Sequence, residues 1–174
     1  MGPMSHQNLS PGSKRKGPPT PKSIGLERGL ELGSPAAKAA IQLAKEHLGR
    51  TGGLMSVHAD FSARDVEEDK LGMTHVRLDR TFGGIQVFGE QVISHIGNDG
   101  QVRGVTGKVP LAVIPETILA KPRLGDDDAL AVAARAFATE PDRKPEVQEV
   151  IFRKADGTYI RAFHVEMAKF SDGE

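Results

Sequence analysis

The sequence predicts an α+β protein with two small units, each a helix packed on an antiparallel sheet, after a disordered N-terminal tail. Two stretches carry apolar residues at helical spacing, and each is followed by segments that alternate apolar and polar residues as strands do. A stretch with three prolines separates the two series and is unsuited to a central strand. The predicted boundaries are 1–33 for the tail, 34–109 for the first unit, 110–125 for the connector and 126–170 for the second unit.

The tail and the first helix differ sharply in composition. Residues 1–33 are rich in Pro, Gly, Ser, Lys and Arg and show no helical or strand period, which is typical of disorder. Ser34 is a good N-cap, and Pro35 suits the first helical position, where its missing N–H costs nothing. The helix continues along one apolar face and is predicted to end at Gly49. The face consists of Ala37, Ile41, Ala44 and Leu48.

The first unit continues as an antiparallel sheet. Segments 55–61, 73–82, 85–96 and 101–109 are predicted strands. In 73–82 one face is mostly apolar and the other is polar, so the strand should be half-buried. Gly83-Gly84 ends this strand, and Asn98-Asp99-Gly100 tolerates the positive φ of a tight hairpin.

The second unit repeats the order of helix and strands. One of Asp126, Asp127 and Asp128 should cap a helix, whose apolar face consists of Leu130, Ala133, Ala134 and Phe137. Strands at 147–154 and 158–168 should form a hairpin through Asp156-Gly157. We describe both units as cystatin-like because each has one helix on an antiparallel sheet.

Composition excludes several classes of function. Lys and Arg number 23 and Asp and Glu number 23, so the balanced charge gives no general attraction to nucleic acid or anionic membranes. There is no cysteine, which removes disulfides, thiolate metal sites and a cysteine nucleophile. No run reaches the ~18 apolar residues of a membrane helix, so no membrane span is expected.

The sequence carries no catalytic signature. It lacks the His-Glu-x-x-His zinc helix and the Gly-x-Ser-x-Gly elbow, so we expect no enzyme activity, no catalytic residues and no cofactor. His75 and His95 could meet across neighbouring strands and bind a metal, but we interpret them as exposed strand histidines and predict no metal site. Asp126-Asp127-Asp128 lacks the alternating ligands of a calcium loop, so helix capping is the preferred interpretation.

A motif in the first unit resembles a known family. It comprises Arg77, Phe82, Gly84-Ile85-Gln86-Val87, Gly89 and Asn98-Asp99-Gly100. This pattern resembles the FTP domain, found in the propeptides of thermolysin-like and fungalysin-like secreted zinc metalloproteases. Family members often have Pro where this chain has Gln86. The second unit looks like the PepSY-type module that follows FTP in such propeptides.

The resemblance implies a function and a partner. Such propeptides inhibit the protease and assist its folding, so the expected partner is a thermolysin-like metalloprotease catalytic domain, in cis or in trans. The resemblance also implies a secreted or periplasmic location. Residues of the motif that point outward should help to bind the protease. The candidates are Arg77, Phe82, Gly84, Ile85, Val87 and Phe88.

A second hypothesis belongs to another class. The chain ends at Glu174 with no protease attached, and PepSY-like units also occur outside protease precursors. The chain would then be a free-standing PepSY/FTP-type binding or scaffold protein without a protease partner. The reading frame beyond Glu174 distinguishes the two, since a continuation into a His-Glu-x-x-His domain favours the propeptide.

Overall fold

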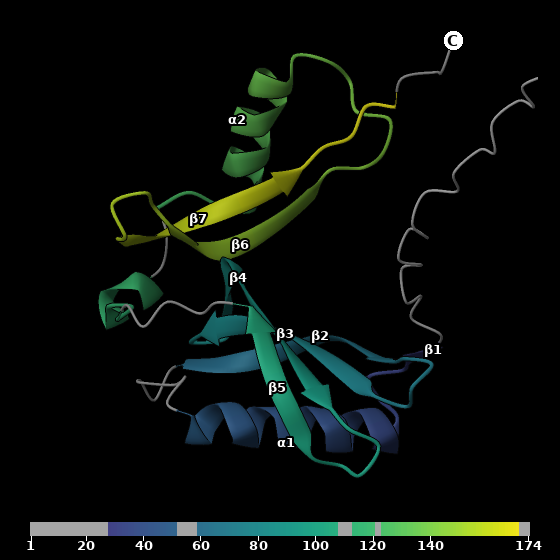
Figure 1. The fold of residues 1–174 in the computed structure, drawn as a ribbon. Coiled ribbons are helices and arrows are strands. Elements are labelled where there is room, and N and C mark those ends of the chain that lie inside the picture. Colours follow the sequence, from purple (N-terminus) through teal and green to yellow (C-terminus); the bar gives the residue numbers. More distant parts are fainter. Residues whose placement is uncertain (1–27, 52–58, 108–112, 121–122, 171–174) are drawn as a thin grey trace, which may run out of the picture.

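A computed structural model describes residues 28–51, 59–107, 113–120 and 123–170, and its elements form a mixed α+β fold (Figure 1). The predicted α+β class is thus confirmed. The elements in chain order are β1 (Arg28–Leu30), α1 (Pro35–Arg50), β2 (Ala59–Glu68), β3 (Thr74–Phe82), β4 (Ile85–Ile96), β5 (Val102–Gly107), the 3₁₀ helix η1 (Glu116–Leu119), α2 (Asp126–Phe137), β6 (Glu146–Arg153) and β7 (Tyr159–Glu166).

One curled sheet contains the strands of both predicted units. Its order is β1-β2-β3-β4-β6-β7, and β5 also pairs with β4. Neighbouring strands are antiparallel except β4 and β6, which pair in parallel at Gln86↔Val150 and Val87↔Ile151. The two units are therefore not separate layers, because a short parallel ladder joins their sheets edge to edge.

Helix α1 begins as its sequence predicts. The Ser34 hydroxyl accepts a hydrogen bond from the Ala37 N–H at 3.2 Å, and Pro35 occupies the first turn. The helix continues past Gly49 to Arg50, and Thr51 closes it by donating its N–H to the His47 carbonyl. Its apolar face covers a first core beneath β2 to β5. That core consists of Ala37, Ala44, Leu48, Phe61, Val66, Val76, Leu78, Val92 and Ile96.

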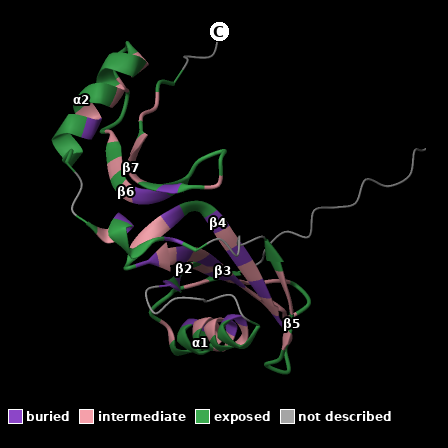
Figure 2. Cartoon of the chain, turned by 90° about the vertical axis from the view of Figure 1, so that its left-hand side faces the viewer, coloured by how far each residue is buried: buried purple, intermediate pink, exposed green. Residues whose placement is uncertain are grey.

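A second core lies where the two units meet. Its members come from the first unit, from the predicted connector and from the second unit. Ile114 and Ile118 supply the connector's share, and both are buried. Figure 2 shows buried segments continuing from β3 and β4 into β6 and β7. The full set is Ala59, Phe82, Val87, Ile114, Ile118, Ile151 and Tyr159.

Helix α2 packs against β6 and β7 but is less buried than expected. Its N-cap is Gly125 instead of an aspartate, and the Asp128 carboxylate accepts a hydrogen bond from the Gly125 N–H at 3.1 Å. Only Ala129 is buried in this helix, and Ala134, predicted on the apolar face, is exposed. Many small alanine side chains present little apolar surface, so the helix lies on the hairpin with a shallow contact.

Two predicted boundaries in the first unit change. Arg28–Leu30 pairs antiparallel with Val66 to Glu68 as β1, so order begins before residue 34, and residues 1–27 lie outside the described part. Strand β2 runs from Ala59 to Glu68 and so continues past the predicted end at residue 61, while residues 55–58 of the predicted strand lie outside the described part. Its charged end still forms a strand because both neighbours, β1 and β3, satisfy its backbone hydrogen bonds.

Candidate functional site

The face of the sheet turned away from α1 is the candidate site. Along β3, Val76, Leu78 and Phe82 are buried toward the cores, and the alternate side chains point to the opposite side. We call this opposite side the open face. It is defined by His75, Arg77 and Asp79 on β3 and their register partners His95, Ile93 and Gln91 on β4.

A bulge in β4 shapes the open face. Between the pairs Asp79↔Gln91 and Thr81↔Gln86, the single β3 residue Arg80 faces the β4 segment 87–90. Gly89 adopts φ +76°, a region that favours glycine. The extra residues turn Phe88 outward, where 40% of it is exposed, and turn Glu90 inward, where 5% is exposed. The glycine therefore directs one aromatic ring to the surface and one carboxylate into the interior.

The inward carboxylate joins three strands. Arg80 on β3 donates to Glu90 at 2.7 Å, and the Tyr159 hydroxyl on β7 donates to the other Glu90 oxygen at 2.8 Å. Burial first, and then the Glu90 carboxylate, raises the pKa of Tyr159. This network fixes the β6–β7 hairpin against the bulge in β4, so it sets the position of β7 relative to β3 and β4.

A cleft of about 520 Å³ opens beside the bulge. Its polar floor is ordered by hydrogen bonds: Gln91 donates to Asp79 at 2.7 Å, and Gln148 donates to Gln86 at 2.7 Å across the β4–β6 junction. Arg77 donates to Gln91 at 3.3 Å. The lining comes from β2, β3, β4, β6 and β7: Arg64, Asp79, Gln86, Phe88, Gly89, Gln91, Glu146, Val147, Gln148, His164 and Glu166. Such a cleft offers amide and carboxylate groups to a partner's backbone or side chains.

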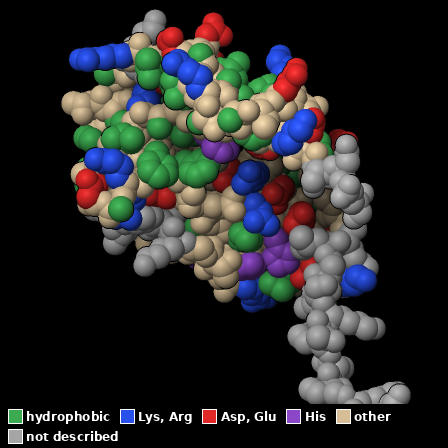
Figure 3. All heavy atoms as spheres, turned by 90° about the horizontal axis from the view of Figure 1, so that it is seen from above, with side chains coloured by type: hydrophobic (Ala, Val, Ile, Leu, Met, Phe, Trp, Pro, Cys, Tyr) green, Lys and Arg blue, Asp and Glu red, His purple; other side chains and the backbone are tan. Residues whose placement is uncertain are grey.

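An exposed aromatic patch borders the cleft. The Phe88 ring lies 4.7 Å from the His164 ring and 6.3 Å from the Phe152 ring, measured between centroids. Phe152 and Ile160, register partners on β6 and β7, are each about two-fifths exposed. Figure 3 shows hydrophobic side chains gathered on one side of this view, beside histidine and charged side chains. Adjacent exposed apolar side chains of this kind mark interaction surfaces.

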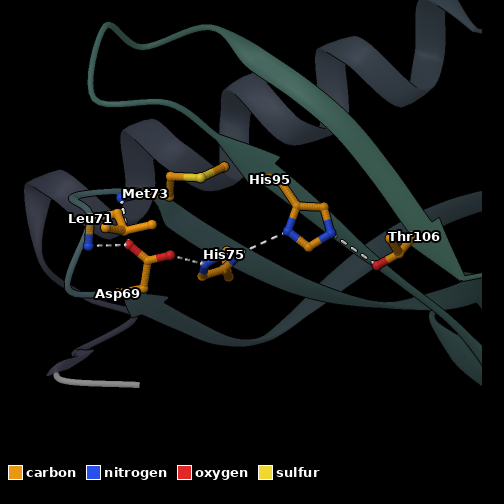
Figure 4. A network of polar contacts seen from close by, with 6 residues as sticks. All are labelled: Asp69, Leu71, Met73, His75, His95 and Thr106. Carbon is orange, nitrogen blue, oxygen red and sulfur yellow. Dashed lines mark hydrogen bonds and ion pairs between the residues drawn. The ribbon is translucent and has the colours of Figure 1, made fainter. Parts of the chain in front are cut away.

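A histidine pair lies at the far end of the open face (Figure 4). His75 and His95 are direct register partners on β3 and β4, and their Nδ1 atoms are 2.8 Å apart. Asp69 and Thr106 contact the outer ring nitrogens. The Met73 N–H, and then His75, lower the pKa of Asp69, whereas burial and then His75 lower the pKa of His95.

The six residues predicted to bind a partner separate into two groups. Arg77 lies on the open face, Phe88 is turned outward at the bulge beside it, and Gly84 lies in the adjoining turn with φ +80°. Phe82 and Val87 are buried in the second core at 1% and 0% exposure, and half-buried Ile85 packs against the same core. Alternation along β3 and β4 directs Phe82 and Val87 inward, so these two support the surface from beneath, whereas Ile85 also lines a pocket with Gly84 and Gln86.

Sequence reasoning missed the contribution of the second unit. Phe152, Ile160 and His164 reach the open face because β6 pairs with β4, and no local pattern encodes that pairing. Glu90 could have been noticed as a lone carboxylate in an apolar strand, opposite Arg80 in the neighbouring strand. Among the residues described, no group of three or more His, Cys, Asp or Glu side chains is arranged to hold a metal ion. Within the same residues, neither α-helix has the length and apolar character required to cross a bilayer.

The comparison with known families agrees with this geometry. Residues 59–109 match the family described as the Fungalysin/Thermolysin Propeptide Motif. The match begins with β2 and includes β3, the bulged β4 and β5, which are the strands that carry most of the open face. This is a motif of propeptides and not of a catalytic domain. The β2 to β5 segment of this chain is therefore similar to the propeptides of fungalysin- and thermolysin-type proteases.

Proposed function

We propose that this chain is a propeptide module that inhibits a thermolysin- or fungalysin-like zinc metalloprotease and assists its folding, in cis or in trans. The observation that carries the proposal is that the propeptide motif coincides with the strands that form the open face. A preformed sheet surface can template a protease whose own folding is slow and non-local. The same surface can then block the catalytic cleft.

The open face and its aromatic patch form the docking surface in this proposal. Phe88 and Phe152 are the anchors, because both rings are about two-fifths exposed and aromatic residues are enriched at the centre of protein interfaces. Arg77 and the amides of Gln86 and Gln148 would form the polar surroundings. An interface of standard size needs about 800 Å² from each partner, which requires both the patch and the cleft.

The second unit has a defined part in this proposal. We assign residues 126–170 to a PepSY-type module and 34–109 to the FTP-type module, joined by the connector 110–125. The sharing of one core and one sheet supports a joint docking surface instead of two independent binding modules. Because the matched motif comes from propeptides of secreted proteases, we also propose a secreted or periplasmic location.

Inhibition and refolding assays test the function. The full 174-residue chain is mixed with a thermolysin-like protease from the same source, and peptide hydrolysis is measured against chain concentration. We expect saturable inhibition, together with a higher yield of active enzyme when the denatured protease domain is refolded with the chain. If neither inhibition nor improved refolding is observed, the proposal is wrong.

A matched pair of variants tests the docking surface. Replacing Phe88 and Phe152 by Ala removes both anchors and should raise the inhibition constant at least tenfold, which is about 1.4 kcal/mol. The control replaces Leu32 and Val132 by Ala. These exposed apolar residues lie outside the aromatic patch, so the inhibition constant should stay unchanged. Equal inhibition by both double variants would place the docking surface elsewhere.

A further inference from the structure

The histidine pair has the geometry of two ligands facing a common point. His75 and His95 face each other across β3 and β4 with ring centroids 5.0 Å apart and ring planes at 75°. The two Nδ1 atoms lie 2.8 Å apart. A dashed line joins the two rings in Figure 4. Each ring thus directs the same nitrogen toward its partner, and the backbones of two central strands fix the positions of both side chains.

The outer nitrogen of each ring is held by an oxygen. Asp69 lies 3.1 Å from His75 Nε2, and the Thr106 hydroxyl lies 3.0 Å from His95 Nε2. Asp69 is itself held, since one of its oxygens accepts the N–H groups of Leu71 at 2.8 Å and Met73 at 2.9 Å. A carboxylate fixed in this way keeps a proton on His75 Nε2 and leaves the Nδ1 lone pair available.

We propose that His75 and His95 form a two-imidazole site for a borderline divalent transition-metal cation, such as Zn²⁺ or Cu²⁺, bound between their Nδ1 atoms. Imidazole nitrogens suit these ions. Two Zn–N bonds of about 2.05 Å at a tetrahedral angle place the nitrogens about 3.3 Å apart, so the rings need to separate by about half an ångström and to tilt until both Nδ1 lone pairs point at the ion. Asp69 and Thr106 are the positioning residues of this site.

The surroundings of the pair suit a cation. A pocket of about 200 Å³ adjoins the two rings and is lined by Asp65, Glu67 and Arg77 among others. Arg77 pairs with Asp65 at 3.2 Å, and Glu67 is the register partner of His75 on β2. Glu67 and Asp69 therefore supply negative charge on one side of the site. The two imidazoles are the protein ligands, and water entering from the pocket completes the coordination.

The metal-bound and metal-free states of the histidine pair differ in the position of one proton. Without metal, an Nδ1–H of one ring donates to Nδ1 of the other. With His75 fixed by Asp69, that proton belongs to His95, whose Nε2 accepts from Thr106. On metal binding, the proton moves through solvent from Nδ1 to Nε2 of His95. The new Nε2–H then donates a hydrogen bond to the Thr106 hydroxyl oxygen. The pair therefore carries the same number of protons with and without the metal ion.

Calorimetric titration of the tag-free full chain with Zn²⁺, repeated with Cu²⁺, tests the site. We expect one ion per chain, and the double variant His75→Ala, His95→Ala should bind at least tenfold more weakly. His47→Ala and His164→Ala, which change histidines elsewhere, should bind as the unmodified chain does. Circular dichroism verifies folding, and His95→Gln offers a smaller change if the double variant unfolds. Unchanged affinity in folded variants of His75 or His95 overturns the proposal.

A substitution outside the ligand pair tests the positioning role. Asp69→Asn can still accept the Leu71 and Met73 N–H groups through its oxygen, but its amide N–H₂ then faces His75 Nε2. That donor favours the tautomer with a proton on Nδ1, which cannot bind a metal. We expect a roughly 10- to 100-fold loss of affinity, as is usual for such partners. An unchanged affinity would show that Asp69 does not orient the site. This inference does not rest on the proposed function, because ion binding is measured directly without a protease.

Discussion

At the scale of single residues, alternation along β3 decides which side chains stabilise the protein and which are presented to a partner. Val76, Leu78, Arg80 and Phe82 are buried, and the intervening residues reach the open face. The predicted half-buried strand is therefore confirmed residue by residue. The reason is the two-residue period of a strand: successive side chains point to opposite faces of the sheet, so the orientation of one residue sets that of its neighbours.

Leu78 provides the first prediction at this scale. It is fully buried in the first core, so Leu78→Ala should lower the free energy of unfolding by about 2–5 kcal/mol through lost burial and a cavity. Urea denaturation measures the change. The control Leu71→Ala, at a residue that is 69% exposed, should stay within about 0.5 kcal/mol. A loss well under 1 kcal/mol at Leu78 would contradict the facing of β3.

At the scale of elements, two short turns determine the geometry of the strands beside the cleft. Gly83 and Gly84 join β3 to β4 with φ +57° and +80°, which is the two-residue turn suited to twisted hairpins. Asp156-Gly157 joins β6 to β7, with Gly157 at φ +85°. Both turns were predicted from the sequence, because glycine is the residue that adopts positive φ without a steric penalty.

Gly84 provides a prediction about the first turn. A Cβ added at Gly84 would contact no other atom, so any loss of stability must come from the strained positive φ of the backbone. Gly84→Val should cost about 1–2 kcal/mol, since a left-handed conformation penalises a residue with a Cβ. Gly84→Asn should cost less, because asparagine tolerates this region. Thermal and urea unfolding of both variants measure the difference. If Asn costs as much as Val, backbone conformation is not the cause.

Asp156 provides a pH prediction about the second turn. Its carboxylate accepts the Thr158 hydroxyl at 2.6 Å and the Thr158 N–H at 2.9 Å, which lowers its pKa from 3.8 to about 2. The folded state thus holds this proton less tightly than the unfolded state. The resulting stabilisation should be complete above pH 3.8 and should be lost as pH falls through about 2.

Two measurements check this pH dependence. An NMR titration of the Asp156 carboxyl carbon should give a midpoint well below 3.8. Urea unfolding between pH 5 and pH 2 should show a smaller acid-dependent loss in Asp156→Asn than in the unmodified chain, because asparagine does not titrate. A midpoint near 3.8 would mean that the hydrogen bonds to Thr158 do not persist in solution.

At the scale of the whole molecule, the two predicted units are joined by a shared interior. They share the second core, the β4–β6 ladder and the buried contacts of Glu90 with Arg80 and Tyr159. Arg161 on β7 also connects the second unit to the predicted connector, because it donates hydrogen bonds to the carbonyls of Leu119 and Ala120 at 2.9 and 2.8 Å. Such a shared interior predicts a single unfolding transition.

Ile151 tests that cooperativity. It is fully buried in the second core although it belongs to the second unit, so Ile151→Ala should cost about 2–5 kcal/mol. Native-state hydrogen exchange should show the same loss of protection in β3 and in β7. The control Ile160→Ala, at a residue that is 42% exposed, should change little. A loss confined to β6 and β7 would show two independently unfolding units.

The sequence by itself determined the local elements of this protein. The helices at Pro35 and Asp126, the facing of β3 and the glycine turns depend on capping, periodicity and backbone φ, which are encoded within a few residues. The resemblance of the motif from Arg77 to Gly89 to propeptides likewise needed only the sequence, and the family match at residues 59–109 agrees with it.

Only the tertiary structure decided how these elements combine. The parallel β4–β6 pairing brings Phe152 and His164 beside Phe88, and the shared core buries Ile114 and Ile118 of the connector. The chain separation between Gln86 and Val150 is too long for any local preference to set their pairing. Pairing and core formation instead depend on the apolar area that the whole chain can bury together, so the composition of the open face emerges only from the complete fold.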